Sequence, residues 1–570
     1  MSGLRFLKSL AVLLAAFAAG SALAYGAWRF EGRLKDIPPA PAGGLVDGKF
    51  ACISYAPYRD GQSPFDVDFV VPRAQIEEDL TILAEHTACV RTYSTDQGLA
   101  EVVPIAARHG LKVLLGAWVG VDLKKNEQEV ASVIALANGY PDTVAAVIVG
   151  NEVLLRRDLT ADNLHAYIRR VKEAVTVPVT YADVWEFWLR NKQIADDVDF
   201  VTVHMLPYWE DQPIAVPGAL RHVGEVLLKV QASFPGKKLF VGEIGWPSLG
   251  RMRQDARPSP SDQTRFLREF VAVSQTLGVG YNFIEAYDQK WKRQSEGTVG
   301  GHWGLYDSQR HPKVELSGPV SDDPKWRRNW LIGVGIGILV LGIGVVGRGP
   351  GTRSTRWLLA AGLLAAVTGS ILQAHLVYLA ETARGLVDWI GGAAGFSFSL
   401  LAAVLGTRSL ADRARGHKIA LPVAMADVLD AVSLRRLVLT RGFLAGAIEA
   451  LVLTFGLATA LAILTDGRYR DFPSTVYLTP AIAFIALRIA TGSRRADDPT
   501  SGILAIGLAV TALLTIVNET FRNTQAIGWV ATALLLSAPW VIDAARSAQA
   551  RARAKVARPN TRPTEAGPAL

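Results

Sequence analysis

The sequence predicts an α/β protein built as a (β/α)8 barrel, followed by an all-α bundle of membrane-spanning helices. Three observations predict this arrangement. The chain has 570 residues, of which 50% are hydrophobic and only 20% charged, and its mean hydropathy is +0.22. Short β-rich runs alternate with amphipathic runs over residues 49–318. Seven apolar stretches, each near the ~20 residues that a spanning helix needs, follow Trp330.

The barrel is predicted from the alternation of strand-like and helix-like segments. Such repeated βα units imply a parallel sheet, and eight of them within residues 49–318 fit a barrel, which typically takes ~250 residues. The expected strands are Phe50–Tyr55, Cys89–Tyr93, Lys112–Ala117, Ala145–Val149, Pro178–Tyr181, Phe200–His204, Lys238–Glu243 and Tyr281–Glu285. The expected helices include Val71–Glu85, Lys125–Asn138, Asp162–Val175, Val216–Ser233 and Ser261–Leu277.

The charge distribution excludes nucleic-acid binding and favours a membrane protein. The net charge of +8 arises from +2 over residues 1–27, −4 over residues 28–328 and +10 over residues 329–570. In that last part the basic side chains lie on short loops between apolar stretches. Two cysteines cannot form a Cys-rich zinc module. We find no metal-ligand spacing and no nucleotide-binding motif in the sequence, so no metal and no cofactor are expected.

The membrane topology follows from the apolar stretches and the arginines and lysines around them. Residues 1–28 form a signal anchor or a cleavable signal peptide, and both readings stay open. A proline- and glycine-rich stretch makes residues 29–48 a flexible linker, residues 329–545 hold seven spans, and residues 546–570 form a basic, disordered cytoplasmic tail. With both termini inside, the inner loops and tail carry 18 Arg and Lys and the outer loops four. The barrel is therefore expected outside the cytoplasm.

Candidate functional residues lie where the expected strands end, because a (β/α)8 barrel carries its chemistry there. Strand four ends at Asn151-Glu152, and strand seven ends at Glu243. Two carboxylates in different environments can divide the roles of acid and nucleophile, as glycosidic cleavage requires. Side chains that could bind a sugar through its hydroxyls or its apolar faces are Tyr55, Arg91, Tyr93, Asn151, Tyr208, Trp246, Glu285 and Trp291. We expect His204, at the end of strand six, to be an inner-barrel residue rather than a proton carrier.

Five motifs in order resemble glycoside hydrolase family 17, which contains β-1,3-glucanases and β-1,3-glucanosyltransferases. They are Ile53-Ser54-Tyr55, Val90-Arg91-Thr92-Tyr93-Ser94, Gly150-Asn151-Glu152, Gly242-Glu243-Ile244-Gly245-Trp246-Pro247-Ser248 and His302-Trp303-Gly304-Leu305. The resemblance implies a retaining enzyme in which Glu152 is the general acid/base and Glu243 the nucleophile. It also implies that Asn151 hydrogen-bonds the 2-hydroxyl of the sugar being cleaved.

The layout of the whole chain resembles the membrane-bound glucosyltransferases of bacterial cyclic β-glucan synthesis. This resemblance implies a β-1,3-glucan transglycosylase, one that forms β-1,6 linkages or branches, in a bacterial inner membrane with its barrel in the periplasm. The expected partners are β-1,3-glucan, the lipid bilayer and a glucan synthase. A β-1,3-glucanase is the alternative, and a glucan-binding or export module with an inactive barrel is the second.

The two cysteines present a choice that the sequence leaves open. Cys52 and Cys89 occupy equivalent places on neighbouring strands, and an oxidising compartment would allow a disulfide. Adjacent parallel strands bring Cα atoms to the short end of the range that disulfides accept, which favours two packed thiols.

Overall fold

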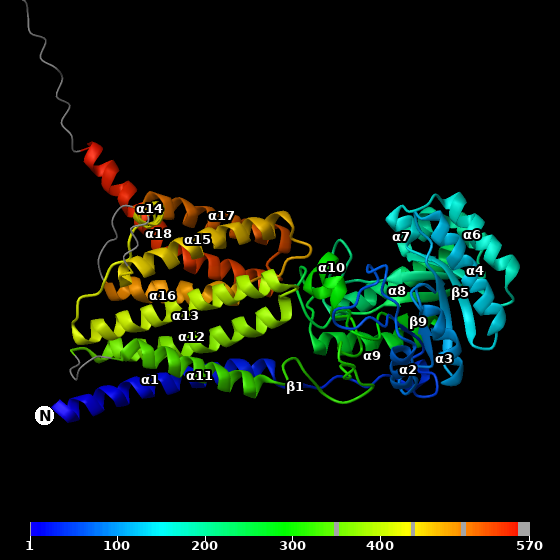
Figure 1. The fold of residues 1–570 in the computed structure, drawn as a ribbon, viewed down its shortest axis with the longest axis horizontal. Coiled ribbons are helices and arrows are strands. Elements are labelled where there is room, and N and C mark those ends of the chain that lie inside the picture. The colour runs from blue at the N-terminus through cyan, green and yellow to red at the C-terminus, as the bar shows by residue number, and fades with distance from the viewer. Residues whose placement is uncertain (1, 347–352, 435–438, 492–497, 557–570) are drawn as a thin grey trace, which may run out of the picture. The chain divides into compact units, whose positions relative to one another are not determined.

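The computed structural model describes residues 2–346, 353–434, 439–491 and 498–556, which form two compact units (Figure 1). One unit contains Gly32–Pro324 and the short segment Arg468–Asp471. The other contains the long helices that precede and follow Gly32–Pro324 in the chain.

The first unit is built around a closed parallel barrel, so the predicted (β/α)8 fold is confirmed. Each strand pairs with the next in the chain, and the last strand closes the ring through the pairing of Ile53 with Phe283. The eight strands are β2 (Ile53–Ser54), β3 (Cys89–Arg91), β4 (Lys112–Ala117), β5 (Val144–Asn151), β6 (Val179–Val184), β7 (Phe200–Met205), β8 (Lys238–Ile244) and β9 (Gly280–Phe283). Every predicted strand is present, with ends that differ by a few residues.

Helices follow the strands and cover the outside of the barrel (Figure 1). They are α2 (Arg73–Ala84), α3 (Val102–Arg108), α4 (Leu123–Gly139), α6 (Ala161–Ala174), α7 (Trp185–Arg190), α8 (Val216–Ser233) and α9 (Pro260–Leu277). Their starts carry capping side chains: Asp122 accepts from two amides of α4, and Ser259 caps α9 ahead of a proline at its first turn. The buried residues of α8, which include Val216, Leu220, Val223, Leu227 and Val230, recur every three or four positions, so one helical face packs on the barrel.

The barrel interior contains a disulfide near the N-terminal ends of β2 and β3. Alternate strand residues point inward, and a small apolar cluster there includes Cys52, Cys89, Leu114 and Ile148. Cys52 and Cys89 are bonded to each other, with their Cα atoms 4.3 Å apart. The packed-thiol alternative is therefore wrong. The pairing of Ile53 with Val90 explains this, because it sets the preceding cysteines side by side, both facing inward.

Most of the segment predicted as a flexible linker, from Gly32 onward, belongs to the barrel unit. Strand β1 (Leu34–Lys35) pairs antiparallel with β10 (Val320–Ser321), which follows the barrel. The buried guanidinium of Arg268 on α9 donates to the carbonyls of Ile37 and Gly318, at 3.0 and 2.9 Å. Prolines in this stretch prevent a helix, but these contacts fix its path.

The second unit is helical, and eight of its described helices are long and apolar enough to cross a membrane. They are α1 (Ser2–Glu31), α11 (Trp326–Val345), α12 (Thr355–Thr382), α13 (Leu386–Arg415), α15 (Arg441–Thr465), α16 (Ser474–Thr491), α17 (Pro499–Glu519) and α18 (Thr524–Val556). They correspond to the N-terminal segment and seven stretches predicted from hydropathy. A shorter helix, α14 (Met425–Ser433), lies between α13 and α15.

Small residues allow these helices to approach one another closely. A Cβ added at Gly369 of α12 would lie 2.4 Å from the backbone nitrogen of Gly337 on α11, so only glycine fits there. Helix α18 continues to Val556, so the first part of the predicted disordered tail is helical. Residues 557–570 of the tail, and Arg348, Arg435, Arg436, Arg494 and Arg495 of the predicted inner loops, lie outside the described residues.

Candidate active site

The end of β5 turns sharply and presents Glu152 at the mouth of the barrel. Gly150 and Glu152 both have positive φ, at 86° and 52°. A Cβ added at Gly150 would lie 2.7 Å from the Val153 side chain, so glycine is required there. Glu152 adopts the left-handed backbone conformation, which residues other than glycine rarely adopt. The amide of Glu152 donates to the carbonyl of Ala182 on β6 at 2.8 Å, which holds the turn. Local backbone strain of this kind is characteristic of functional sites.

Glu243 lies within β8 and faces Glu152 across the mouth. One carboxylate oxygen of each residue lies within 4.8 Å of the other, and a ring nitrogen of His204 lies within the same distance of both. The Glu152 side chain is 22% exposed and that of Glu243 is 6% exposed. The two carboxylates are therefore close together but differ in solvation. Retaining glycosidases hold their two carboxyl groups about 5–5.5 Å apart.

Glu243 is held ionised by the groups around it. Burial by itself would raise the pKa of Glu243, but the imidazole of His204, the guanidinium of Arg91 and the hydroxyl of Tyr93 outweigh it and keep the pKa below its ordinary value. Arg91 Nη1 lies 3.1 Å from Glu243 Oε1, and the Tyr93 hydroxyl donates to the same oxygen at 2.8 Å. An ionised, desolvated carboxylate beside an open mouth is suited to nucleophilic attack.

Arg91 also orients Asn151. Its second terminal nitrogen donates to Asn151 Oδ1 at 2.6 Å, while Nη1 donates to the carbonyl of Gly242 at 2.7 Å. Because the oxygen of the Asn151 amide is occupied by Arg91, its NH2 group is the part that can donate to a ligand in the mouth. Arg91 itself is fully buried, so its place is beneath the ligand position rather than against it.

His204 lies between the two carboxylates. Its Nδ1 is 3.0 Å from Glu152 Oε1 and 3.7 Å from Glu243 Oε2. The sequence prediction gave His204 only a place inside the barrel and therefore missed its contact with both glutamates. The sequence did contain a signal for this contact, because His204 and Glu243 both lie at the ends of predicted strands. In the structure β7 pairs with β8, and His204 lies opposite Glu243.

Comparison with known proteins identifies the family. A model of the BtgE/BtgC glycoside hydrolase domain matches residues 52–304. The glycoside hydrolase family 17 β-1,3-glucanosyltransferase of Rhizomucor miehei is a structural neighbour with 23% identity and a TM-score of 0.42, covering 47% of this chain and 98% of that chain. The glucan 1,3-beta-glucosidase of Arthroderma benhamiae is 30% identical over 286 residues, which are 46% of this chain and 88% of that protein. The chain belongs to glycoside hydrolase family 17. It is thus an enzyme of the glycoside hydrolase type.

A second fungal relative agrees with this membership. The glucan 1,3-beta-glucosidase of Saccharomyces cerevisiae is 27% identical over 262 residues, 42% of this chain and 84% of that protein. The similarity lies in the barrel. The eight candidate spans lie outside the residues matched by the family model.

Two aromatic side chains predicted to bind sugar lie beneath the family 17 site instead. Trp246 is fully buried, stacks on Phe266 at 5.4 Å and donates its indole N–H to the carbonyl of Arg257. Tyr208 is fully buried as well, with its hydroxyl donating to the carbonyl of Arg251 at 2.6 Å. Neither ring has a face free for a sugar, because Trp246 and Trp303 pack against Tyr208 and Phe266 stacks on Trp246.

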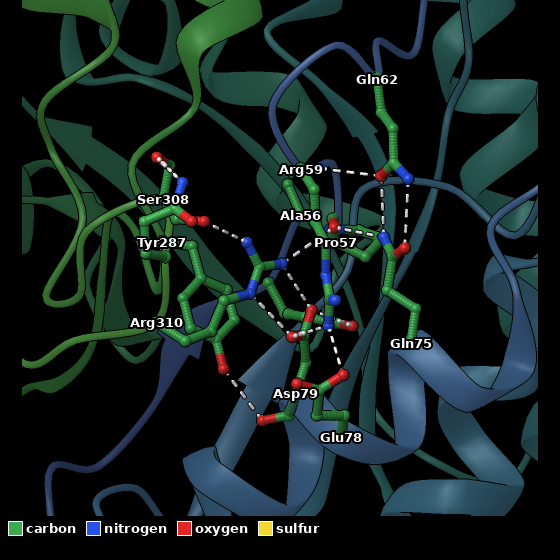
Figure 2. Close-up of polar contacts among 12 residues, drawn as sticks. Ala56, Pro57, Arg59, Gln62, Gln75, Glu78, Asp79, Tyr287, Ser308 and Arg310 are labelled. Atoms are coloured by element: carbon green, nitrogen blue, oxygen red, sulfur yellow. Dashed lines mark hydrogen bonds and ion pairs between the residues drawn. The ribbon is translucent and has the colours of Figure 1, made fainter.

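Tyr55 is also buried, and it belongs to a polar network that fixes the loop after β2. Its hydroxyl donates to Asp79 of α2 at 3.1 Å, and burial together with the Asp79 carboxylate raises the pKa of Tyr55 well above its ordinary value. Figure 2 shows the rest of the network: Arg310 donates to the Asp79 carboxylate from two nitrogens, each at 2.9 Å, and Tyr287 donates to the Asp79 carbonyl. Arg310 and Gln75 both donate to the carbonyl of Pro57. Tyr55 therefore supports the rim of the site.

The remaining predicted residues lie on the loop after β9. Glu285 is buried and pairs with Lys292 at 2.8 Å. Burial raises the pKa of Glu285 to about 7, against the opposing charge of Lys292. Trp291 is partly exposed and contacts Tyr58 and Phe65 edge to face, so part of its ring remains open to a ligand. The structure thus leaves Tyr93, Asn151, Glu152 and Trp291 partly accessible, with the buried Glu243 beside them.

The carboxylates and the imidazole also bear on metal binding. Within the part of the chain that the structure describes, Glu152, His204 and Glu243 form a set of donors close enough to hold a metal ion. Arg91 places a fixed positive charge 3.1 Å from one of those carboxylates. This charge repels a divalent cation at the same position, so the donor set fits proton transfer and nucleophilic attack better than metal binding.

Proposed function

We propose that this protein is a retaining β-1,3-glucan transglycosylase anchored in a membrane. The observation that carries the proposal is the approach of Glu152 and Glu243 to within 4.8 Å in unlike surroundings. Inverting enzymes need about 6.5–9.5 Å between the carboxyl groups to accommodate a water molecule. Fungal relatives named glucan 1,3-beta-glucosidases support β-1,3-linked glucan as the substrate class.

In the first step, Glu243 attacks the anomeric carbon of a β-1,3-linked glucosyl unit. A bond forms between that carbon and the Glu243 carboxylate, and the glycosidic carbon–oxygen bond breaks. Glu152 gives its proton to the departing oxygen, so the leaving sugar is released as an alcohol. His204, 3.0 Å from Glu152, is placed to stabilise the carboxylate that remains. The Asn151 amide supports the 2-hydroxyl of the reacting sugar.

In the second step, a hydroxyl of another glucan chain attacks the same carbon. Glu152 now accepts the proton of that hydroxyl, the bond to Glu243 breaks, and Glu243 leaves as a carboxylate. The stereochemistry at the anomeric carbon is inverted twice and therefore retained. The energy of the broken linkage is conserved in the new one, so no nucleotide sugar is required.

Hydrolysis is the second candidate function, and the names of the relatives favour it. If water replaces the acceptor hydroxyl in the second step, the protein is a β-1,3-glucanase. We favour transfer because eight candidate spans suit an enzyme that assembles glucan at a membrane better than one that digests it. A binding or export module with an inactive barrel is disfavoured by the paired carboxylates and the groups that hold Glu243 ionised.

We further propose that the barrel faces the periplasm from a bacterial inner membrane, next to a glucan synthase. The excess of Arg and Lys on alternate loops supports the orientation. The disulfide between Cys52 and Cys89 supports an oxidising compartment. The curated relatives named above are fungal, so the bacterial setting and the formation of β-1,6 linkages rest on the layout of the chain.

The experiment that tests the proposal uses the full chain in detergent with a β-1,3-gluco-oligosaccharide of defined length. Products are separated by size, and their linkages and first-formed anomers are read by NMR. Products longer than the substrate are expected, with the β-configuration formed first, and Glu243→Gln should abolish them. Shorter products alone would establish the glucanase. An α-anomer formed first would overturn the retaining mechanism.

A further inference from the structure

A half-exposed indole lies on the turn that follows β4, a position to which no role has been assigned above. Trp118 comes directly after the last residue of that strand and is 41% exposed. Its backbone N–H donates to the buried carboxylate of Glu129 at 3.3 Å. Two hydrogen bonds of 2.8 Å join the Asn126 amide to the backbone of Gly120, which closes the turn. The backbone that carries this exposed aromatic side chain is therefore fixed.

The segment that carries Glu152 contacts the same indole. Arg156, at the end of the short helix α5 (Val153–Arg156), places its guanidinium 4.3 Å from the ring centre of Trp118. Arg156 also donates to the carbonyl of Asn151 and, at 2.8 Å, to the carboxylate of Asp158. The side chain of Arg156 thus contacts both Trp118 and the Asn151-Glu152 turn. A guanidinium on the indole is paired with a carboxylate, so groups that can donate to and accept from a sugar hydroxyl lie near Trp118.

The order of the strands places Trp118 across the mouth from Glu243. In the closed ring of eight strands, β4 and β8 are four steps apart in either direction, so they are diametrically opposite. Strand β5, which carries Glu152, is next to β4. Displacement at an anomeric carbon is in line, so the leaving oxygen lies on the side away from the nucleophile. A sugar released by attack from Glu243 therefore departs toward Glu152 and the turn that carries Trp118.

We propose that Trp118, with Arg156 and Asp158, forms the subsite for the leaving and incoming glucosyl unit. The apolar face of a β-linked glucose covers the exposed part of the indole, and the Arg156–Asp158 pair hydrogen-bonds its hydroxyls. This inference rests on the proposed function and extends it, because it assigns the residues that favour an acceptor hydroxyl over water. It also gives Trp118 a specificity role, without any part in the bond-making steps.

The test separates acceptor binding from the first chemical step in the full chain. The donor is the β-glycosyl fluoride of a β-1,3-linked gluco-disaccharide, since fluoride leaves without occupying a sugar subsite. Fluoride release reports the first step, and the concentration of a β-1,3-linked trisaccharide that gives half-maximal transfer reports acceptor binding. The variants are Trp118→Ala and Trp118→Phe. Val121→Ala is the matched control, because Val121 lies on the same turn and is 75% exposed.

For Trp118→Ala we expect the half-saturating acceptor concentration to rise about tenfold, because the acceptor loses one apolar contact face. This rise is measured relative to any change in the rate of fluoride release. Trp118→Phe should keep most of the affinity, and Val121→Ala should change neither quantity. If the half-saturating acceptor concentration of Trp118→Ala stays within twofold of the wild-type value, the subsite assignment is wrong. A wild type that releases fluoride but never extends the acceptor would also overturn it. Absence of fluoride release from the wild type would instead refute the proposed function.

Discussion

The ionisation of Glu243 can be tested through Arg91. In Arg91→Met the buried guanidinium, 3.1 Å from Glu243 Oε1, is replaced by an uncharged side chain. An opposite charge at such a distance lowers a carboxyl pKa by about 1–3 units. Glu243 must be ionised to attack, so activity rises with pH through its pKa. Removing the positive charge raises that pKa, and the acidic limb of the pH profile should move to higher pH by about one unit or more.

The assay is kcat/KM for fluoride release from the disaccharide fluoride between pH 4 and 8, because this ratio reports groups of the free enzyme. Below the acidic limb, a shift of one unit corresponds to a tenfold loss of activity beyond any loss that is independent of pH. Arg91→Lys keeps a charge and should restore most of the limb's position, although it loses the contact with Asn151. Arg190→Met, an exposed site on α7, is the control. An acidic limb unchanged in Arg91→Met, or moved to lower pH, would refute the reasoning.

Three further predictions concern the catalytic pair and the stability of the barrel. Glu152→Gln and Glu243→Gln should each lower oligosaccharide turnover by several orders of magnitude, measured as product per unit time; near-wild-type turnover in either would remove its assigned role. Cys52→Ser should lower the free energy of unfolding in denaturant by about 4 kcal/mol, because the bond closes a loop with a sequence separation of 37; equal midpoints with and without reductant in the wild type would contradict this. Asp79→Asn should lower the free energy of unfolding by about 3–5 kcal/mol, because it leaves the buried guanidinium of Arg310 without its charge partner. Glu78→Gln, which breaks an exposed pair with Arg59, should lower it by at most about 1 kcal/mol. Equal losses in Asp79→Asn and Glu78→Gln would show that burial is not the cause.

The sequence by itself determined the barrel, because the strand and helix patterns are local. Runs of β-branched residues alternate with helical periodicity, and each predicted strand has a counterpart from β2 to β9. The ends of those strands identified Glu152 and Glu243, since parallel strands in a barrel all present their carboxyl ends to one face. Hydropathy likewise predicted the eight candidate spans without any knowledge of their packing.

Only the tertiary structure decided which side chains face the mouth and which lie beneath it. Tyr208 and Trp246 follow strand ends just as Trp118 does, yet the rings of Trp303 and Phe266 cover the first two, while Trp118 stays half exposed. The contact of His204 with both glutamates and the disulfide likewise depend on pairings between residues far apart in sequence. Residue type and local period specify an element and its position in the chain. Burial and electrostatics depend on non-local neighbours, which become defined only when the barrel closes.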